Sequence, residues 1–484
     1  MSDGARRPNR RLSTENQSAS TRDDGQQPSD SGAEPVLREA SRRNLRKAPA
    51  QASPHPPEAP SPPVRPPSKQ PPRSARDGLL IFATRITRLF AYGFLSVFLA
   101  LYLTGLGLNS TETGVLLTLA LLGDTGISLW LTTRADRVGR RRMLIAGAIL
   151  MLVAGVVFAI TRNYALLLIA ATIGVISPSG SEAGPFLAIE QAALSQMVPD
   201  SRRVPVFAWY NLVGPFATAT GALVGGSLAQ GLQNSGMPPV QSYRAVVIGY
   251  ALAGLALAIM FSRLSPTIET PAAIGGKKRD RLSLHASRPI VMRLSALFAL
   301  DAFGGGFVLQ TLVAYWLTAR FQTAPLVLGA IFFAANILAG VSALAASRVA
   351  SRIGILNTMA GAPIPSNIFL ILVPFMPNLP LAIAMLLLRF SIPQMDGPTQ
   401  RTYILALVSP DEKSAAADVS GVTRSVGAAL SPALAGLFLG HPSLAGVPFL
   451  LAGSIKIAYE LMMRLTFRGV SLEKSHSSSA SMKD

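Results

Sequence analysis

The feature that most constrains this chain is a succession of long apolar runs, which begins near residue 79 and continues almost to the C-terminus. A helix needs about 20 predominantly apolar residues to cross the hydrocarbon of a bilayer. The runs are continuous and do not alternate with polar residues as barrel strands do, so we predict an all-α integral membrane protein. Twelve transmembrane helices are predicted, over residues 79–104, 111–133, 143–160, 164–197, 205–230, 243–263, 291–319, 325–346, 356–375, 381–408, 415–440 and 443–466.

The fourth and tenth runs differ from the others in length and in proline content. Both are longer than a bilayer requires. Pro178 and Pro185 lie in the fourth run, and Pro393 and Pro398 lie in the tenth. Because proline removes a helix hydrogen bond, we expect these two helices to be tilted or bent rather than straight.

The segment before the first run, residues 1–77, is polar and rich in proline and arginine. Residues 1–76 hold 14 of the 36 prolines, and no apolar stretch before Leu79 is long enough for a cleavable signal peptide. Such a composition cannot bury enough apolar surface to fold, so we predict a disordered cytoplasmic arm. A solvated extension is the favoured interpretation. The alternatives are a lipid tether through the basic cluster at 42–47 and a partner-binding proline-rich segment.

The distribution of Lys and Arg predicts the orientation in the membrane. The chain has 44 Lys and Arg against 25 Asp and Glu, a net charge of +19. Outside the arm these positive charges lie between apolar spans, which argues against a nucleic-acid partner. They gather in the even-numbered connections, whereas the odd-numbered connections have few, chiefly Arg162 and Arg320. The positive-inside rule then places both termini in the cytoplasm, with the protein in the inner or plasma membrane and in contact with its lipids.

A basic stretch at residues 264–290, rich in glycine and proline, divides the membrane body into two halves. We predict six-helix halves at 78–263 and 291–468, a cytoplasmic linker between them and a cytoplasmic tail at 469–484. A monomer is expected.

Several chemistries are excluded by what the sequence lacks. It has no Cys and only four scattered His, so no metal site is expected. The closest string to a nucleotide-binding loop, Gly275-Gly276-Lys277-Lys278, lacks the first Gly and the final Ser or Thr. No nucleophile and base stand at a recognisable spacing. We therefore expect no cofactor and no enzyme activity.

The two halves repeat a short pattern. Arg137-Val138-Gly139 in the second connection corresponds to Arg352-Ile353-Gly354 in the eighth. Gly184-Pro185 in the fourth run likewise corresponds to Gly397-Pro398 in the tenth. Internal repeats of this kind are typical of transporters built from two related halves, with a site between them near the middle of the membrane.

The second connection also carries a family motif. It reads Thr132-x-x-x-Asp136-Arg137-x-Gly139-Arg140-Arg141. With twelve spans and a basic central linker, the chain resembles the major facilitator superfamily over about residues 78–468, although Thr132 replaces the expected first Gly. The resemblance implies a gating latch, in which Asp136 interacts with the start of the eleventh helix near residues 414–418.

The residues of this connection also have physical roles of their own. Gly139 permits a tight turn, and Asp136 can accept backbone N–H groups at a helix start. Arg137, Arg140 and Arg141 can hold the connection at anionic headgroups, and Arg352 and Gly354 are their counterparts in the second half. The alternative interpretation is a topology determinant alone.

Ionisable residues inside the spans are costly and are therefore candidates for function. Most fall on the first, fourth, seventh and tenth spans, which line the central cavity in the resembled fold. They are Arg85, Arg88, Asp124, Glu182, Glu190, Asp301, Arg389, Asp396, Arg401 and Arg424. Asp301, Asp396, Glu182 and Asp124 are the predicted proton sites, in that order. Structural ion pairs are the alternative for each of them.

Basic and amide side chains are the predicted substrate contacts. Arg389, Asp396 and Gln400 follow helical spacing and are expected on one face of the tenth span. Arg85 and Arg88 share a face of the first span, but they can also snorkel to headgroups. Tyr210, at the start of the fifth span, is expected in the interfacial belt, where Tyr is common, and no chemistry is predicted for it.

These observations favour a secondary active transporter that works by alternating access. The predicted activity is proton-coupled export of a small organic or anionic solute. Proton-coupled uptake of an anionic metabolite and a non-transporting membrane sensor or scaffold are the alternatives.

Overall fold

The computed structural model describes residues 72–181, 185–269, 287–353, 361, 363–392, 396–409 and 411–467. Residues 1–71 of the predicted arm, most of the linker, Glu182 and Gly354 lie outside these residues. The prediction of disorder was wrong for residues 72–77, which begin the first helix. Residues 67–484 form one compact unit, to which everything below refers.

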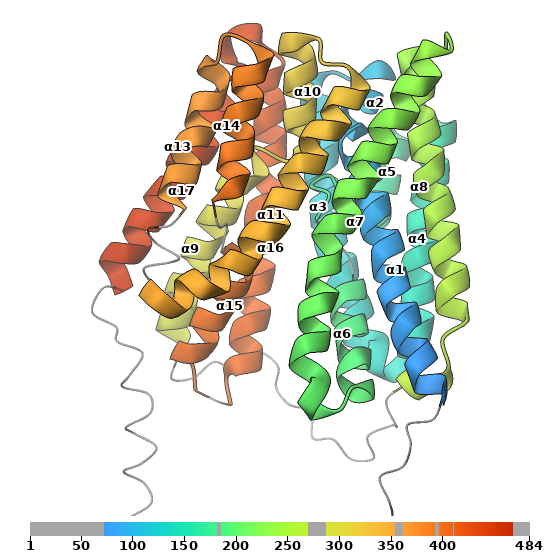
Figure 1. Ribbon diagram of the computed structural model, residues 1–484, viewed down its shortest axis with the longest axis vertical. Coiled ribbons are helices and arrows are strands. Elements are labelled where there is room, and N and C mark those ends of the chain that lie inside the picture. The colour runs from blue at the N-terminus through green and yellow to red at the C-terminus, as the bar shows by residue number, and fades with distance from the viewer. Residues whose placement is uncertain are drawn as a thin grey trace, which may run out of the picture. The chain divides into compact units, whose positions relative to one another are not determined.

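Every regular element among the described residues is helical (Figure 1), which confirms the predicted fold class. In the part of the chain that the structure describes, nine helices are long and apolar enough to cross a membrane. Three shorter apolar helices, Tyr164–Ile173, Ile364–Phe375 and Leu379–Ser391, lie within the fourth, ninth and tenth predicted spans.

The first half contains eight helices and one 3-10 turn. They are α1 (Pro72–Ser96), α2 (Leu99–Gly105), α3 (Ser110–Val138), α4 (Arg140–Ile160), α5 (Tyr164–Ile173), α6 (Phe186–Met197), α7 (Asp200–Asn234), α8 (Pro239–Ser262) and η1 (Pro266–Ile268). The described elements of the second half are α9 (Arg288–Gly306), α10 (Gln310–Phe321), α11 (Pro325–Ile353), α13 (Ile364–Leu372), η2 (Val373–Phe375), α14 (Leu379–Ser391), α15 (Asp396–Leu407), α16 (Lys413–Leu439), η3 (Pro442–Leu444) and α17 (Val447–Phe467).

The fourth and tenth spans are broken, not merely bent. The fourth is interrupted between α5 and α6, and the tenth between α14 and α15. Gly174 and Ile392, which end α5 and α14, have extended backbone, and Ile392 is followed by proline, which disfavours a helical conformation in the residue before it. The first and seventh spans are also interrupted, between α1 and α2 and between α9 and α10. Only a tilt or bend of the fourth and tenth spans was predicted, so the four breaks are a finding of the structure.

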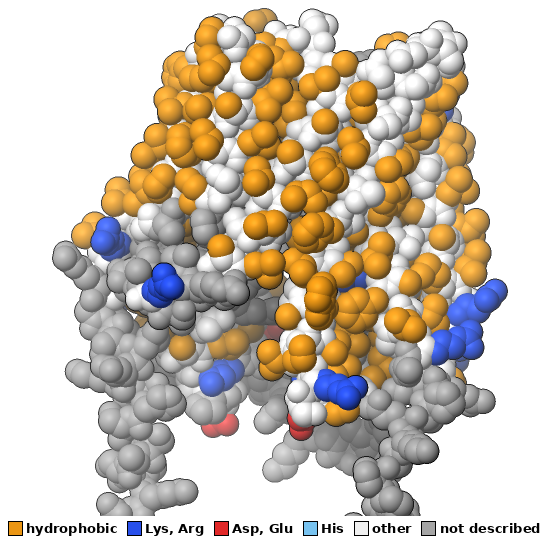
Figure 2. All heavy atoms as spheres, viewed as in Figure 1, with side chains coloured by type: hydrophobic (Ala, Val, Ile, Leu, Met, Phe, Trp, Pro, Cys, Tyr) orange, Lys and Arg blue, Asp and Glu red, His pale blue; other side chains and the backbone are white. Residues whose placement is uncertain are grey.

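The two ends of the helical body differ in charge. We call the end with the even-numbered connections, which carries Gly139 and the start of α9, the basic end. The opposite end, at the α2–α3 and α10–α11 connections, is the far end. On the face shown in Figure 2, hydrophobic side chains cover most of the height, and Lys and Arg gather toward the basic end.

The halves pack through small residues. Helix α3 lies against α16, and α7 lies against α11. A Cβ on Gly114 of α3 would lie 2.4 Å from the carbonyl oxygen of Pro432, and one on Gly226 of α7 would lie 2.9 Å from the Cα of Gly329. Glycine at these crossings lets the helix backbones approach without a side chain between them.

Hydrogen bonds join the halves from the helix breaks to the far end. The Gln310 side-chain amide donates to Ser96 Oγ at 3.0 Å, and the Ala100 backbone N–H donates to Thr311 Oγ1 at 2.8 Å. The hydroxyls of Ser110 and Tyr315 lie 3.0 Å apart. At the basic end the space-filling view is hollowed between the halves (Figure 2). The conformation is therefore closed at the far end.

Candidate functional site

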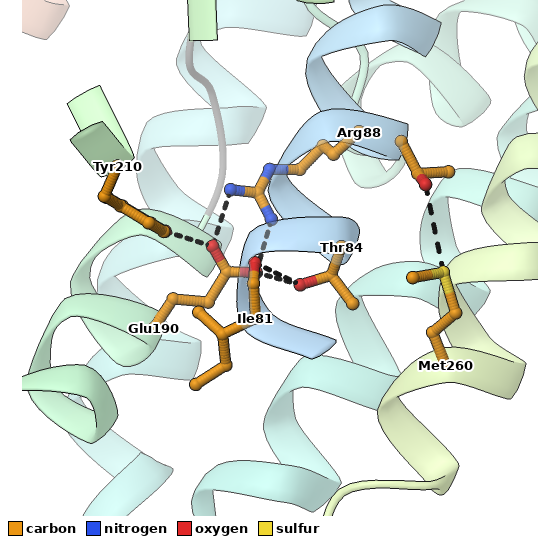
Figure 3. Close-up of polar contacts among 7 residues, drawn as sticks. Ile81, Thr84, Arg88, Glu190, Tyr210 and Met260 are labelled. Atoms are coloured by element: carbon orange, nitrogen blue, oxygen red, sulfur yellow. Dashed lines mark hydrogen bonds and ion pairs between the residues drawn. The ribbon is translucent and has the colours of Figure 1, made fainter. Parts of the chain in front are cut away.

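A buried ion pair occupies the centre of the first half (Figure 3). Arg88 on α1 donates from both terminal nitrogens to the two carboxylate oxygens of Glu190 on α6, each at 2.8 Å. Neither side chain has any exposed surface. Thr84 donates to the same carboxylate at 3.0 Å, and so does the Tyr210 hydroxyl. Four donated hydrogen bonds therefore hold the Glu190 carboxylate.

Aromatic rings complete this cluster. The guanidinium carbon of Arg88 lies 4.7 Å from the ring centroid of Phe186, and that of Arg85 lies 4.1 Å from the centroid of Tyr210. Tyr210 is fully buried, so its assignment to the interfacial belt was wrong. Its position at the start of the fifth span indicated the interface but not the direction of its side chain. Each residue along a helix turns the side-chain direction by about 100°, so neighbouring residues at the same depth can point outward or inward.

A second polar cluster joins four helices of the other half. Lys456 on α17 lies 2.6 Å from the Asp301 carboxylate on α9, and Gln400 on α15 donates to the second Asp301 oxygen at 3.0 Å. Arg424 on α16 donates to the Gln400 carbonyl oxygen at 3.0 Å. The Gln400 amide also lies 3.1 Å from the Tyr459 hydroxyl. Asp301 and Gln400, both predicted as site residues, are thus brought together.

Two buried charges of α17 were missed in the sequence. Lys456 is 8% exposed, and Glu460, which accepts a hydrogen bond from Asn367 at 2.7 Å, is 2% exposed. The signal was present, since the two residues stand four apart in the twelfth span and so share a helix face.

A cavity of about 270 Å³ lies where three of the broken spans meet. Ser179 and Ser181 line it from the break of the fourth span, Gly305 and Gln310 from the seventh, and Arg389 from the tenth. Asn336 of α11 and the rings of Phe332 and Phe390 complete its polar and aromatic lining. Helix breaks free backbone and side-chain polar groups beside a cavity, as in other transporters.

The second cluster adjoins this cavity. A Cβ on Gly305 would lie 3.8 Å from Lys456 Cε, so the Asp301–Lys456 pair stands directly behind the wall that Gly305 forms. Gly306, at the end of α9, has no room for a side chain because a Cβ would lie 2.3 Å from the Ala428 carbonyl oxygen. The glycine run of the seventh span thus packs a neighbouring helix and also lines the cavity.

The remaining predicted site residues do not form one constellation. Asp124 lies on α3 in the first half. Glu182 lies outside the described residues, as does the side chain of Asp396. The expected shared face of Arg389, Asp396 and Gln400 is wrong, because Arg389 belongs to α14 and the other two to α15, with the break between them.

The motif connection is a single residue. Helix α3 ends at Val138 and α4 begins at Arg140, and Gly139 between them has φ of +113°, a conformation that side chains rarely adopt. The first N–H groups of α4 are capped by Glu269, which accepts from Arg140 N at 2.7 Å and from Arg141 N at 3.3 Å. The capping role predicted for Asp136 stays a prediction, because its side chain lies outside the described ones, and Glu269 was not predicted as a cap. Arg137 and Arg352 are exposed.

Comparison with known proteins agrees with this architecture. The family model described as Major Facilitator Superfamily matches residues 81–432, and the chain belongs to this superfamily. It is therefore a multi-pass membrane transporter by family.

Particular relatives were found as well. The chain is 28% identical over 427 residues to the membrane protein YJR124C of Saccharomyces cerevisiae, covering 82% of this chain and 95% of the yeast protein. Among solved structures, it resembles a bacterial homologue of the lysosomal transporter Spinster in an inward-facing, occupied conformation, at 15% identity and a TM-score of 0.66, with 83% and 98% of the chains covered. It also resembles the nucleoside transporter NupG, at 14% identity and a TM-score of 0.63, with 81% of this chain and 100% of the NupG chain covered. These structural likenesses concern the fold.

Proposed function

We propose that the protein transports a small organic anion by alternating access, coupled to protons, and that the physiological direction is export from the basic end. The observation that carries the proposal is the cavity at the helix breaks, where one guanidinium, that of Arg389, stands among amides, hydroxyls and two aromatic rings.

The cavity lining favours an anion with a small apolar body. Arg389 is 8% exposed, and its guanidinium can bind a carboxylate or phosphate through two parallel hydrogen bonds. Gln310 and Asn336 supply amides that accept or donate, and Phe332 and Phe390 supply apolar surface. A cavity of about 270 Å³ suits a solute with few non-hydrogen atoms.

The Asp301–Lys456 pair is the proposed coupling element. Protonation of the Asp301 carboxylate removes the negative charge that holds Lys456 at 2.6 Å, and an unpaired ammonium is costly in a low-dielectric interior. Lys456 must then move or find another partner, and Glu460 stands four residues away on the same helix face. Because the pair adjoins Gly305, such a movement alters the cavity wall.

The direction follows from charge. Exit of an anion and entry of a proton both carry positive charge inward, so a membrane potential that is negative inside drives both, by about 2.3 kcal/mol per charge per 100 mV. This requires the basic end to face the cytoplasm, as the positive-inside rule predicts. Ser201→Cys at the basic end and Ser235→Cys at the far end test that orientation with an impermeant maleimide, because the native chain has no Cys.

The test of function uses the purified full chain in reconstituted vesicles, with radiolabelled benzoate, salicylate and succinate and with benzamide as the neutral control. We expect an imposed pH gradient to drive protein-dependent accumulation of an anion, above the level in protein-free vesicles, and no protein-dependent accumulation of benzamide. Arg389→Gln should lower anion flux about tenfold or more, the effect of losing a charge-assisted hydrogen bond.

Asp301→Asn separates coupling from transport. This variant should retain anion exchange and lose its response to the pH gradient. Asp200→Asn, a carboxylate-to-amide change at an exposed position, is the matched control and should behave as the native chain does. The proposal is wrong if no anion of the panel moves, or if Asp301→Asn still follows the gradient.

A further inference from the structure

A second and larger cavity, of about 560 Å³, opens at the far end of the second half. It lies between the ends of α10, η2, α16 and α17, away from the helix breaks that line the transport cavity. Its wall includes Tyr315, Trp316 and Arg320 of α10, Phe375 of η2 and Val447 of α17. None of these residues lines the proposed transport cavity or belongs to the proposed coupling pair.

The lining of this cavity combines one positive charge with aromatic and hydroxyl groups. Arg320 is the single Lys or Arg among its lining residues, and its guanidinium carbon lies 5.8 Å from the Trp316 ring centroid. Phe375 is 61% exposed, although Trp316 is 2% exposed. Ser110 and Ser443 add hydroxyls. A guanidinium beside aromatic surface matches a ligand with an anionic group and an apolar body.

The cavity also spans the contact between the halves. Ser110 belongs to α3 of the first half, and its hydroxyl lies 3.0 Å from that of Tyr315 in the second. Both residues line the cavity. Alternating access must separate them when the far end opens, so a complete cavity exists only while the far end is closed. A ligand that needs both walls binds this state in preference to the other and shifts the population toward it.

We infer that this cavity, defined by Arg320, Trp316, Tyr315 and Ser110, is a regulatory binding site for an organic anion with an apolar body, and that its occupant holds the carrier closed at the far end. Binding itself does not depend on the proposed transport function. Only its inhibitory consequence for flux rests on that function.

Trp316 provides a direct reporter of binding. The chain has three Trp, and the other two, Trp130 and Trp209, are 50% and 63% exposed away from this cavity. In a Trp130→Phe/Trp209→Phe chain in nanodiscs, 4-nitrobenzenesulfonate should quench Trp316 fluorescence saturably, because Trp316 lines the cavity and is otherwise nearly buried. The neutral analogue 4-nitrobenzamide should quench weakly.

Variants then test the assigned residues. Arg320→Gln should weaken the binding of 4-nitrobenzenesulfonate about tenfold or more. Arg162→Gln, at the other exposed arginine of a far-end connection, should leave it unchanged. Ala319→Phe fills the cavity from an exposed lining position and should abolish saturable quenching without a change of charge. Linear quenching, equal quenching by both nitroaromatics, or equal affinity in Arg320→Gln would overturn the proposal.

Lipid composition distinguishes the source of the natural ligand. If phosphatidylglycerol in the nanodisc competes with 4-nitrobenzenesulfonate in the native chain and not in Arg320→Gln, the occupant is an anionic lipid. If phosphatidylglycerol has no effect and the sulfonate still binds, the occupant is a soluble anion. Both results support an anion site.

The state preference is tested by distance. Spin labels at Ser235→Cys and Pro377→Cys, exposed far-end positions on the two halves, report whether that end is closed. Saturating 4-nitrobenzenesulfonate should increase the population of short distances, and the increase should be lost in Arg320→Gln. A shift toward longer distances would contradict the proposed locking.

Discussion

The Arg88–Glu190 pair allows a quantitative test of how buried charge stabilises this fold. Replacing either partner alone with Met leaves the other charge in a fully buried position, for which a cost of about 3–5 kcal/mol is expected. Replacing both removes the two charges together. The cost then falls to about 2 kcal/mol, because no charge is left buried and the hydroxyls of Thr84 and Tyr210 lose the carboxylate as an acceptor.

The assay is unfolding in mixed micelles, with the helical signal followed as denaturing detergent is added. The coupling energy between the two positions should be at least about 4 kcal/mol, since two single losses of about 3 kcal/mol or more exceed the loss of about 2 kcal/mol in the double variant by that amount. The same cycle on Asp200 and Arg203, an ion pair with 87% and 46% exposed side chains, should give less than about 1 kcal/mol. The reasoning is refuted if the single variants are as stable as the native chain. It is also refuted if the double variant loses as much free energy of unfolding as the two single variants together.

Three further changes test the backbone geometry. Gly139→Ala should destabilise the protein by about 1–3 kcal/mol in the same assay, because φ of +113° is strained for alanine, and native stability would contradict this. Glu269→Ala should cost about 1 kcal/mol through loss of the α4 cap, whereas an equal or higher stability would show that the cap contributes nothing. Gly114→Leu places a side chain against the Pro432 carbonyl and should lengthen the far-end distance between spin labels at 235 and 377; an unchanged distribution would rule out this contact as the closure.

Local patterns were sufficient for most of the topology. Continuous apolar runs determine where helices cross the membrane, because a spanning segment must satisfy its own backbone hydrogen bonds. The prolines of the fourth and tenth spans indicated irregularity there, but not its extent. A bent helix and a broken helix differ in how neighbouring helices accommodate the freed backbone groups. The sequence of a single span does not contain the positions of those neighbours.

The candidate site was predictable in part for the same reason. Asp301, Arg88 and Gln400 stood out because charge and amides inside apolar runs are costly. Lys456 and Glu460 carry the same signal and were overlooked. Tyr210 could not have been assigned, because its role depends on the Glu190 carboxylate of another helix.

By itself, the sequence determined that this is an all-α membrane protein of two related halves, because hydropathy and basic connections act locally and repeat along the chain. Only the tertiary structure decided which charges are partners, that Glu269 caps α4, and that two cavities lie at the helix breaks and at the far end. Each of these features depends on helices that are far apart in the sequence. Packing against neighbouring helices determines how each helix is rotated and how deep it lies, and the residue pattern of a single segment does not predict either.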